Sequence, residues 1–112
     1  MLRNTRLVGG LLLLAVTAYA PGLAHAQMAD SGAGKKRAAV CFACHSENGI
    51  SIIPGTPNLA GQDQTYLANA LTAYRGAQLR QDPTMTAMAK PLSDQDIANI
   101  AAYFSSLPRD GK

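Results

Sequence analysis

The chain has 112 residues, and its ten Lys and Arg against seven Asp and Glu give a formal net charge of +3. Two of the ten basic residues lie within the first 26 residues, so residues 27–112 carry a net charge of only +1. This small charge argues against nucleic-acid binding, because that usually needs a strong basic stripe. With no Trp and only two Phe the apolar inventory is thin, and domains of this size often need a disulfide, a metal or a cofactor to be stable.

Residues 1–26 have the features of a secretory signal peptide. Two arginines give a positive start, and an apolar run extends to about Ala20. The tripeptide Ala24-His25-Ala26 has the small-x-small pattern of a cleavage site, so we predict cleavage before Gln27. A retained membrane anchor is less favoured, because the apolar run is shorter than the roughly 20 residues that span a bilayer. We therefore expect residues 27–112 to form one periplasmic domain without stable membrane insertion.

The first helix is expected from about Gly34 to Cys44, because Gly34, Ala38 and Cys41 recur on one face. It carries the charged run Lys35-Lys36-Arg37, for which a solvated helix face is a better interpretation than a surface that steers an acidic partner. A loop follows from Ser46 to Gly61, where Asn-Gly, Pro-Gly and Thr-Pro pairs mark turns.

The second helix is expected from about Gln64 to Arg75, with Asp63 as its N-cap and Gly76 as its stop. Residues 78–91 are irregular, with at most a short helix after Pro83. The last helix follows the N-cap Ser93, has two aspartates in its first turn and ends at Pro108. Its apolar stripe consists of Ile97, Ile100, Ala101, Phe104 and Leu107. The sequence shows no convincing strand pattern, so the predicted fold class is all-α with long loops.

The chemistry-bearing residues are concentrated in the pentapeptide Cys41-Phe42-Ala43-Cys44-His45. Cys-x-x-Cys-His is the attachment signature of c-type haem. Cysteines three apart at the end of a helix lie side by side, so they can form thioethers with two vinyl groups on one edge of the ring. His45 is then carried beneath the iron, where its imidazole can serve as the proximal ligand. The motif thus predicts one covalently bound haem c, with its iron, per chain.

Three other interpretations of the two cysteines compete with haem attachment. A structural disulfide between Cys41 and Cys44 is compatible with an oxidising compartment. A thioredoxin-like redox pair needs a preceding strand in a βαβ setting, whereas the preceding residues here are expected to be helical. A zinc site usually needs four ligands, and the exported chain offers two Cys and one His.

The sixth iron ligand can be narrowed by elimination. His25 belongs to the signal peptide, so two histidine ligands within one exported chain are excluded. Methionine sulfur is the remaining strong candidate, from Met28 near the frayed start or from Met85 and Met88 just before the last helix. Any of these methionines can instead be core filler, and their spacing alone does not choose between Met85 and Met88.

The exported chain resembles the class I cytochromes c, specifically the small bacterial cytochromes c-553 and single halves of the diheme cytochromes c-four. The resemblance covers nearly all of residues 32–107. It implies the class I cytochrome c fold, with three to four helices and long loops wrapped around one covalently bound haem. It rests on residues 39–45 (AVCFACH), 57–62 (PNLAGQ) with Tyr66-Leu67, 85–94 (MTAMAKPLSD) and 97–107.

The resemblance also implies roles for individual residues. The family's ligand Met stands seven residues before the Leu of a Leu-Ser-Asp stretch, which favours Met85 over Met88 as the distal ligand. The carbonyl of Pro57 is expected to hold the ring of His45. Gly34 and Tyr103 match the family's residues at the crossing of the first and last helices, and Ser46 stands where a Gly is frequent. From the residues themselves, helical spacing favours core packing for Tyr66 and Tyr74 over a place near the haem, and Arg75 and Arg80 are candidate partners of the haem propionates.

The expected function is periplasmic electron transfer, with the haem iron cycling between its ferrous and ferric states. With His and Met ligands no coordination position is left for a substrate, so we expect an electron carrier rather than an enzyme. The expected partners are a redox donor and a redox acceptor that dock transiently on a monomer. The alternative is an electron-transfer subunit of a periplasmic dehydrogenase or oxidase complex.

Overall fold

The computed structural model describes residues 9–10, 15 and 28–112. The predicted cleavage site and nearly all of the predicted signal peptide lie outside the described residues, so both stay predictions. Among the described residues no helix has the length and hydropathy needed to cross a bilayer. The helices are α1 (Ser31–Arg37), the 3-10 helix η1 (Ala38–Cys41), α2 (Phe42–His45), α3 (Gln64–Gly76), α4 (Pro83–Ala89) and α5 (Asp94–Ser105). Residues 28–112 contain no strand, which confirms the all-α fold class.

One bent helical segment runs from Ser31 to His45, because α1, η1 and α2 follow one another without a gap. It confirms the expected first helix and begins about one turn earlier. The side chain of Asp30 caps its start by accepting a hydrogen bond from the backbone N–H of Ala33 at 3.0 Å. Ser46 ends the segment with a φ of 66° and a ψ of 155°. Residues other than glycine rarely adopt this conformation, which explains why glycine is frequent at that position in the family that the sequence resembles.

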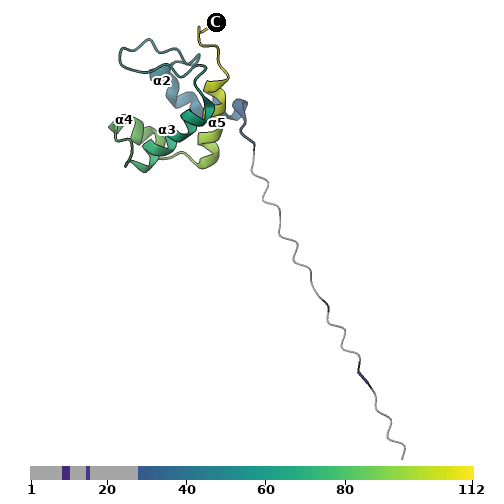
Figure 1. Cartoon of the computed structure of the whole chain (residues 1–112). Coiled ribbons are helices and arrows are strands. Elements are labelled where there is room, and N and C mark those ends of the chain that lie inside the picture. Colours follow the sequence, from purple (N-terminus) through teal and green to yellow (C-terminus); the bar gives the residue numbers. More distant parts are fainter. Residues whose placement is uncertain (1–8, 11–14, 16–27) are drawn as a thin grey trace, which may run out of the picture.

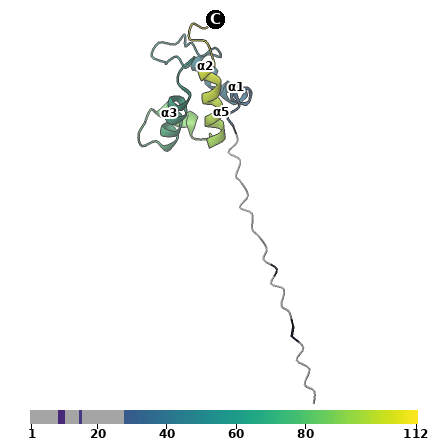
Figure 2. The same ribbon diagram turned by 45° about the vertical axis from the view of Figure 1, so that its right-hand side comes forward.

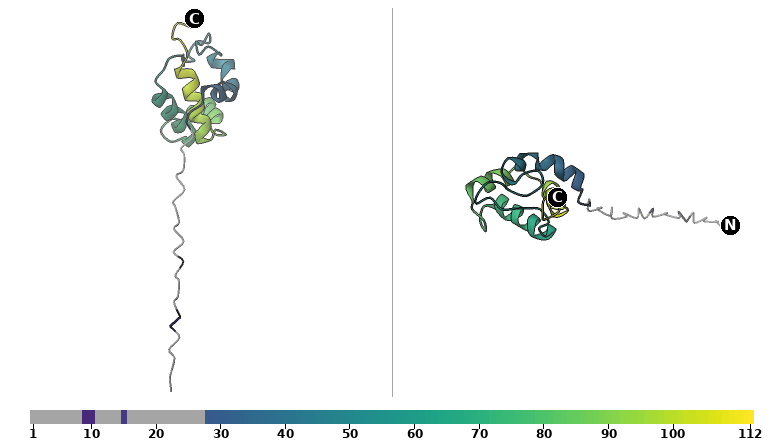
Figure 3. Two further views of the ribbon diagram at one scale, coloured as in Figure 1. Left: turned by 90° about the vertical axis from the view of Figure 1, so that its right-hand side faces the viewer. Right: turned by 90° about the horizontal axis from the view of Figure 1, so that it is seen from above.

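Helix α5 lies in the middle of the fold, between α1 on one side and α3 on the other (Figures 1 and 2). The same order is visible edge-on in the left panel of Figure 3. Helix α1 approaches α5 closely at Gly34, where a Cβ atom would lie 1.9 Å from the backbone oxygen of Asn99. The expected crossing of the first and last helices is thus present, with Gly34 against the backbone of Asn99 and Ile100, one turn before Tyr103.

A buried asparagine, Asn99, fixes this crossing and was not expected from the sequence. Its side-chain oxygen accepts hydrogen bonds from the backbone N–H of Asp30 and from the amide of Gln95, both at 2.8 Å. Only 8% of Asn99 is exposed, so these bonds compensate the cost of burying its oxygen. The side chain thereby links the residue before α1 to the inner face of α5.

The core lies where α1, α3 and α5 meet, and the apolar stripe predicted for α5 is buried as expected except at its end. Helix α5 stops at Ser105, so the predicted end at Pro108 is wrong. The hydroxyl groups of Ser105 and Ser106 donate to the carbonyls of Ala102 and Tyr103, and such local bonds compete with helix continuation. Three aromatic rings fill the core beside the Cys-x-x-Cys-His motif, with centroids 5.0 to 6.4 Å apart: Phe42, Tyr103 and Phe104.

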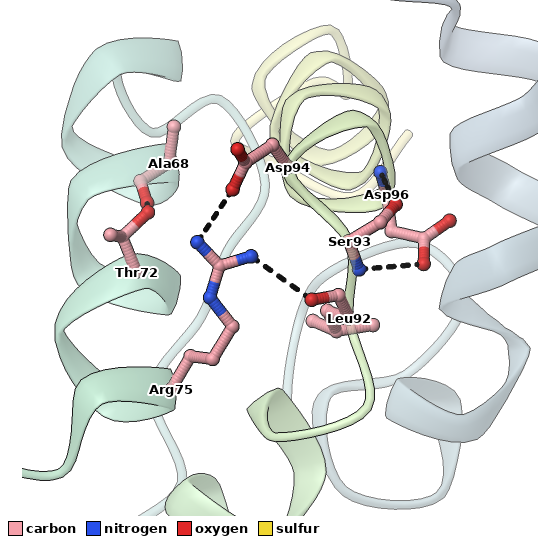
Figure 4. Close-up of polar contacts among 7 residues, drawn as sticks. All are labelled: Ala68, Thr72, Arg75, Leu92, Ser93, Asp94 and Asp96. Carbon is pink, nitrogen blue, oxygen red and sulfur yellow. Dashed lines mark hydrogen bonds and ion pairs between the residues drawn. The ribbon is translucent and has the colours of Figure 1, made fainter.

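Arg75, near the end of α3, joins that helix to the start of α5 (Figure 4). Its guanidinium donates to the Leu92 carbonyl at 3.0 Å and to the Asp94 carboxylate at 2.6 Å. Next to this junction, Ser93 and Asp96 form a reciprocal capping box that starts α5 and confirms the expected N-cap.

Helix α3 matches its prediction except at its C-terminus. Gly76 is the last helical residue rather than the stop, and Ala77 takes the left-handed conformation with a φ of 55°. The Ala77 N–H bonds to the carbonyls of Ala73 and Tyr74, so the last turn closes one residue later than expected. The short helix expected after Pro83 is α4, with Asp82 as its N-cap.

Candidate functional site

A cavity of about 500 Å³ lies among η1, α2, the loop around Pro57, and helices α3, α4 and α5. Its volume lies in the range of roughly 300–1,000 Å³ that is typical of small-molecule and cofactor sites. The wall is largely apolar, and its side chains include Val40, Leu59, Leu67, Leu71, Ile100 and Phe104. A few polar and sulfur-bearing side chains also reach the cavity, and they include most of the site residues predicted from the sequence.

The motif residues Cys41, Cys44 and His45 all line this cavity from η1 and α2. Cys41 is half-buried, Cys44 is exposed, and both are free thiols. Burial raises the pKa of the Cys41 thiol, and the nearby Arg37 offsets only part of this effect. A buried thiol with a raised pKa stays protonated near neutral pH, whereas thioredoxin-like cysteines have lowered pKa values. The helix before Cys41, in place of a strand, also disfavours the thioredoxin-like interpretation.

His45 is buried, with 7% of its surface exposed, and its Nδ1 atom lies 2.8 Å from the carbonyl oxygen of Pro57. A carbonyl only accepts hydrogen bonds, so Nδ1 carries a proton, and Nε2 is the ring nitrogen that is left to bind a metal. In residues 28–112 no group of three or more His, Cys, Asp or Glu side chains is placed to hold a metal ion, which leaves the zinc interpretation without support.

The loop that carries Pro57 is folded back onto the motif by specific hydrogen bonds. The Ser51 hydroxyl donates to the Cys44 carbonyl at 2.9 Å, and the Ser51 N–H donates to the side chain of Asn58 at 2.8 Å. Farther along, the backbone N–H of Leu59 bonds to the carbonyl of Gly49 at 2.8 Å. These bonds fix the Pro57 carbonyl relative to the end of α2, so the loop holds the imidazole in one orientation.

Met85 and Met88 both reach the cavity from α4. Met85 is half-buried, whereas Met88 is 39% exposed. The Asp82 carboxylate accepts the backbone N–H of Met85 at 2.8 Å and so fixes this residue in the first turn of α4. Met28 is 89% exposed and does not line the cavity. Met85 and Met88 are therefore the two methionines placed to act as the distal ligand, and Met85 is the better shielded from water.

Tyr66 and Tyr74 form part of the cavity wall, together with Arg80. Tyr66 is 49% exposed, so the expectation that it packs in the core is wrong. Tyr74 is partly buried against the core, as its helical spacing indicated, and it lines the cavity as well. Of the two arginines that were candidates for propionates, Arg75 is paired with Asp94 and does not line the cavity, whereas Arg80 does.

The charged run at the end of α1 is largely neutralised. Lys35 pairs with Glu47 at 2.8 Å, and Arg37 lies 3.4 Å from the carboxylate of Asp96. The Lys35–Glu47 pair is solvent-exposed, as expected for a solvated helix face. This arrangement favours that interpretation over a surface that steers an acidic partner.

The donor set and the cavity fit a covalently bound haem. Two thiols at the Cys-x-x-Cys spacing, one imidazole with an available nitrogen, and a half-buried thioether border the same largely apolar space. Imidazole and thioether are the axial ligands of iron in His–Met cytochromes, and an apolar surrounding suits a macrocycle.

Comparison with known proteins agrees with this fit. The family model described as cytochrome c matches residues 31–108. Cytochrome c-554(548) of Halomonas halodenitrificans is 47% identical over 79 residues, which are 69% of this chain and 95% of that protein. Cytochrome c4 of Pseudomonas aeruginosa is 46% identical over 103 residues, which are 92% of this chain and 48% of that protein.

A solved structure is similar as well. The crystal structure of reduced recombinant cytochrome c4 from Pseudomonas stutzeri matches with a TM-score of 0.68 and 42% identity, over 71% of this chain and 46% of that one. The chain therefore spans about half the length of the cytochrome c4 proteins that it matches. These matches confirm both the resemblance inferred from the motifs and the class I cytochrome c fold.

Proposed function

The chain belongs to the cytochrome c family, whose members bind haem c covalently, and we propose that it carries single electrons through one such haem. Cys41 and Cys44 are the proposed thioether attachments. His45 is the proposed proximal ligand of the iron, and Met85 is the proposed distal ligand. The observation that carries this proposal is the convergence of these four side chains on one largely apolar cavity, with the Nδ1 atom of His45 already bonded to Pro57.

The bound group would supply an iron that alternates between ferrous and ferric states, with a raised potential because its ligands are His and Met. The chain's own contribution is to hold the ligands still and keep water out. The Pro57 carbonyl fixes the tautomer and orientation of His45 and makes its Nε2 a stronger donor. The Asp82 cap fixes the backbone of Met85. A site with such fixed ligands rearranges little when its charge changes, which suits electron transfer.

Location and partners are part of the same proposal. The predicted signal peptide supports export to the periplasm, where the chain would work as a monomer that docks briefly on a redox donor and a redox acceptor. Cys44 is exposed, so the cavity edge beside it offers a short path for electrons to a docked partner. Because Lys35 and Arg37 are paired within the chain, we do not assign a steering role to α1.

Absorbance spectra of the protein purified from the periplasm test the haem assignment. The haem is expected to remain attached to the polypeptide after denaturation and to be lost from it when Cys41 and Cys44 are both replaced by Ser. A wild-type protein without haem absorbance would overturn the proposal. Size measurement in the same preparation distinguishes a monomeric shuttle from a stable heteromer, and a heteromer would favour the alternative role as a complex subunit.

The two methionines provide a matched pair of variants for the distal ligand. The ferric protein is expected to show a weak long-wavelength band from sulfur-to-iron charge transfer. Met85→Ala should abolish this band, whereas Met88→Ala should largely keep it, because Met88 is the more exposed of the two. A band that survives in Met85→Ala and disappears in Met88→Ala would transfer the ligand role to Met88.

A further inference from the structure

Arg80 differs from the other charged residues because it lines the cavity and its guanidinium is held between two tyrosine side chains, Tyr66 and Tyr74. Its Cζ atom lies 5.7 Å from the ring centroid of Tyr66 and 5.2 Å from that of Tyr74. Its Nη2 donates to the Tyr66 hydroxyl at 3.1 Å, and its Nη1 donates to the Tyr74 hydroxyl at 3.4 Å. Two tyrosines of α3 thus hold the guanidinium of Arg80, which belongs to the following loop, at the cavity.

No carboxylate of residues 28–112 forms an ion pair with this guanidinium. Lys35, Arg37 and Arg75 each have such a partner, and Arg80 does not. Asp82 also borders the cavity, but its carboxylate caps α4 at Met85. The bonds to Tyr74 and Tyr66 raise the pKa of Arg80, so it stays cationic at any physiological pH.

The unused hydrogen-bonding capacity of this group matches a carboxylate. A guanidinium has five N–H donors in a planar fork, and the tyrosines take two of them. The remaining donors suit the two oxygens of one carboxylate, which arginine binds in a bidentate way more readily than lysine does. Each tyrosine hydroxyl accepts from Arg80 and keeps its own proton to donate to the same anion.

A haem carries two propionate carboxylates, which must be hydrated or paired when the ring enters an apolar cavity. We propose that Arg80, clamped by Tyr66 and Tyr74, binds a propionate of the haem and thereby helps to set its reduction potential. This inference rests on the proposed function, because it requires a haem in the cavity. It assigns the propionate role to Arg80 and not to Arg75, whose guanidinium is bound to Asp94 and to the Leu92 carbonyl outside the cavity (Figure 4).

The expected consequence concerns the balance between the two oxidation states. A propionate without its cation leaves an extra negative charge near the iron, and this charge favours the ferric state over the ferrous state. Arg80→Gln should therefore lower the midpoint potential, with about a three- to tenfold change in the equilibrium constant between the two states. For a one-electron couple a tenfold change corresponds to about 59 mV.

A redox titration of the purified holoprotein tests this inference, with Arg75→Gln as the matched control. Both variants change the net charge by the same amount and both remove an arginine close to α3. The Arg75→Gln protein should be less stable than the wild type but should keep nearly the same midpoint potential. The equilibrium constant between its two oxidation states should change by no more than about twofold. Equal potentials for Arg80→Gln, Arg75→Gln and the wild type, with an unchanged haem spectrum, would overturn the role of Arg80 and reduce it to a structural brace for the tyrosines.

Arg80→Lys keeps the test decisive if Arg80→Gln does not yield folded protein. This variant retains the charge but removes the planar fork and its fit against the two rings, so we expect a smaller shift in the same direction. A wild-type potential in Arg80→Lys would then count against the proposal. Failure of the proposed function itself has a different signature, because the wild-type protein would then contain no covalently bound haem to titrate.

Discussion

The imidazole of His45 is held by a backbone atom twelve residues later, because its Nδ1 lies 2.8 Å from the carbonyl oxygen of Pro57. The loop between α2 and α3 is therefore part of the site, although it contributes no side-chain ligand in our proposal. A backbone acceptor cannot be removed by changing a side chain, so the loop must be tested through its conformation.

We expect Pro57→Gly to lower the free energy of unfolding by about 1 kcal/mol, because the unfolded chain gains backbone freedom. It should also raise the midpoint potential, since a weaker Nδ1 hydrogen bond makes His45 a poorer donor to ferric iron. The rise in midpoint potential should stay below about 59 mV, which corresponds to a tenfold change in the equilibrium constant between the ferrous and ferric states. Denaturant unfolding and redox titration measure the two effects. Pro54→Gly, in the same loop, should reproduce only the loss of stability, and equal potentials in both variants would contradict the role of Pro57.

Gly34 is required where α1 meets α5, and Gly34→Ala should be strongly destabilising. Its new Cβ would lie 1.9 Å from the Asn99 oxygen and 2.5 Å from the Asn99 carbonyl carbon, so one helix must move away from the other. Overpacking of this kind typically costs about 1–3 kcal/mol, which denaturant unfolding can measure. Gly76→Ala is the control, because nothing lies within 4 Å of a Cβ there. That variant should be neutral or up to about 1 kcal/mol more stable, because alanine favours the helix.

These two sites illustrate what the sequence could and could not predict. The helices, the N-caps Asp63 and Ser93 and the Cys-x-x-Cys-His motif are encoded by local patterns, so each was predicted close to its observed position. The contact of Gly34 with the backbone at Asn99, and the bond from the Asp30 N–H to the Asn99 side chain, join segments more than sixty residues apart. No local pattern encodes such pairs. The prediction for Tyr66 was wrong for a related reason, because helical periodicity marks an apolar face without telling whether a given residue on it meets the core or a cavity.

Among the described residues, two other than glycine, Ser46 and Ala77, have a positive φ, and replacing them should stabilise the protein. Ser46 has a φ of 66° and a ψ of 155°, a region that costs other residues about 1–3 kcal/mol. Ala77 has a φ of 55° and a ψ of 22°, where the cost is about 1–2 kcal/mol. We expect Ser46→Gly to raise the free energy of unfolding by about 1 kcal/mol and Ala77→Gly by somewhat less, since glycine also gains freedom in the unfolded chain. A loss of stability in Ser46→Gly would show that the serine side chain compensates its strained backbone.

The capping box of α5 makes stability depend on pH through Asp96. Hydrogen bonds from the backbone and the hydroxyl of Ser93, helped by Arg37, hold the pKa of this carboxyl below its usual value, although partial burial opposes them. A lowered pKa in the folded state means that the carboxylate stabilises the fold above the unfolded value of about 3.9. This contribution is lost as the pH falls from there through the folded pKa.

Asp96→Asn should accordingly be less stable than the wild type at pH 7 and should approach the wild type only once the pH has fallen below the folded pKa of Asp96, where both side chains are neutral. Denaturant unfolding at a series of pH values gives this difference directly, because other titrating groups, including any haem propionates, cancel between the two proteins. Ser93→Ala separates the cap from the charge. It removes the hydroxyl that accepts the Asp96 N–H and should cost about 1 kcal/mol at pH 7. Most of this cost should remain at low pH, because only the bond between the hydroxyl and the Asp96 carboxylate depends on the charge. A constant gap between Asp96→Asn and the wild type across the series would show that the Asp96 charge does not stabilise the start of α5.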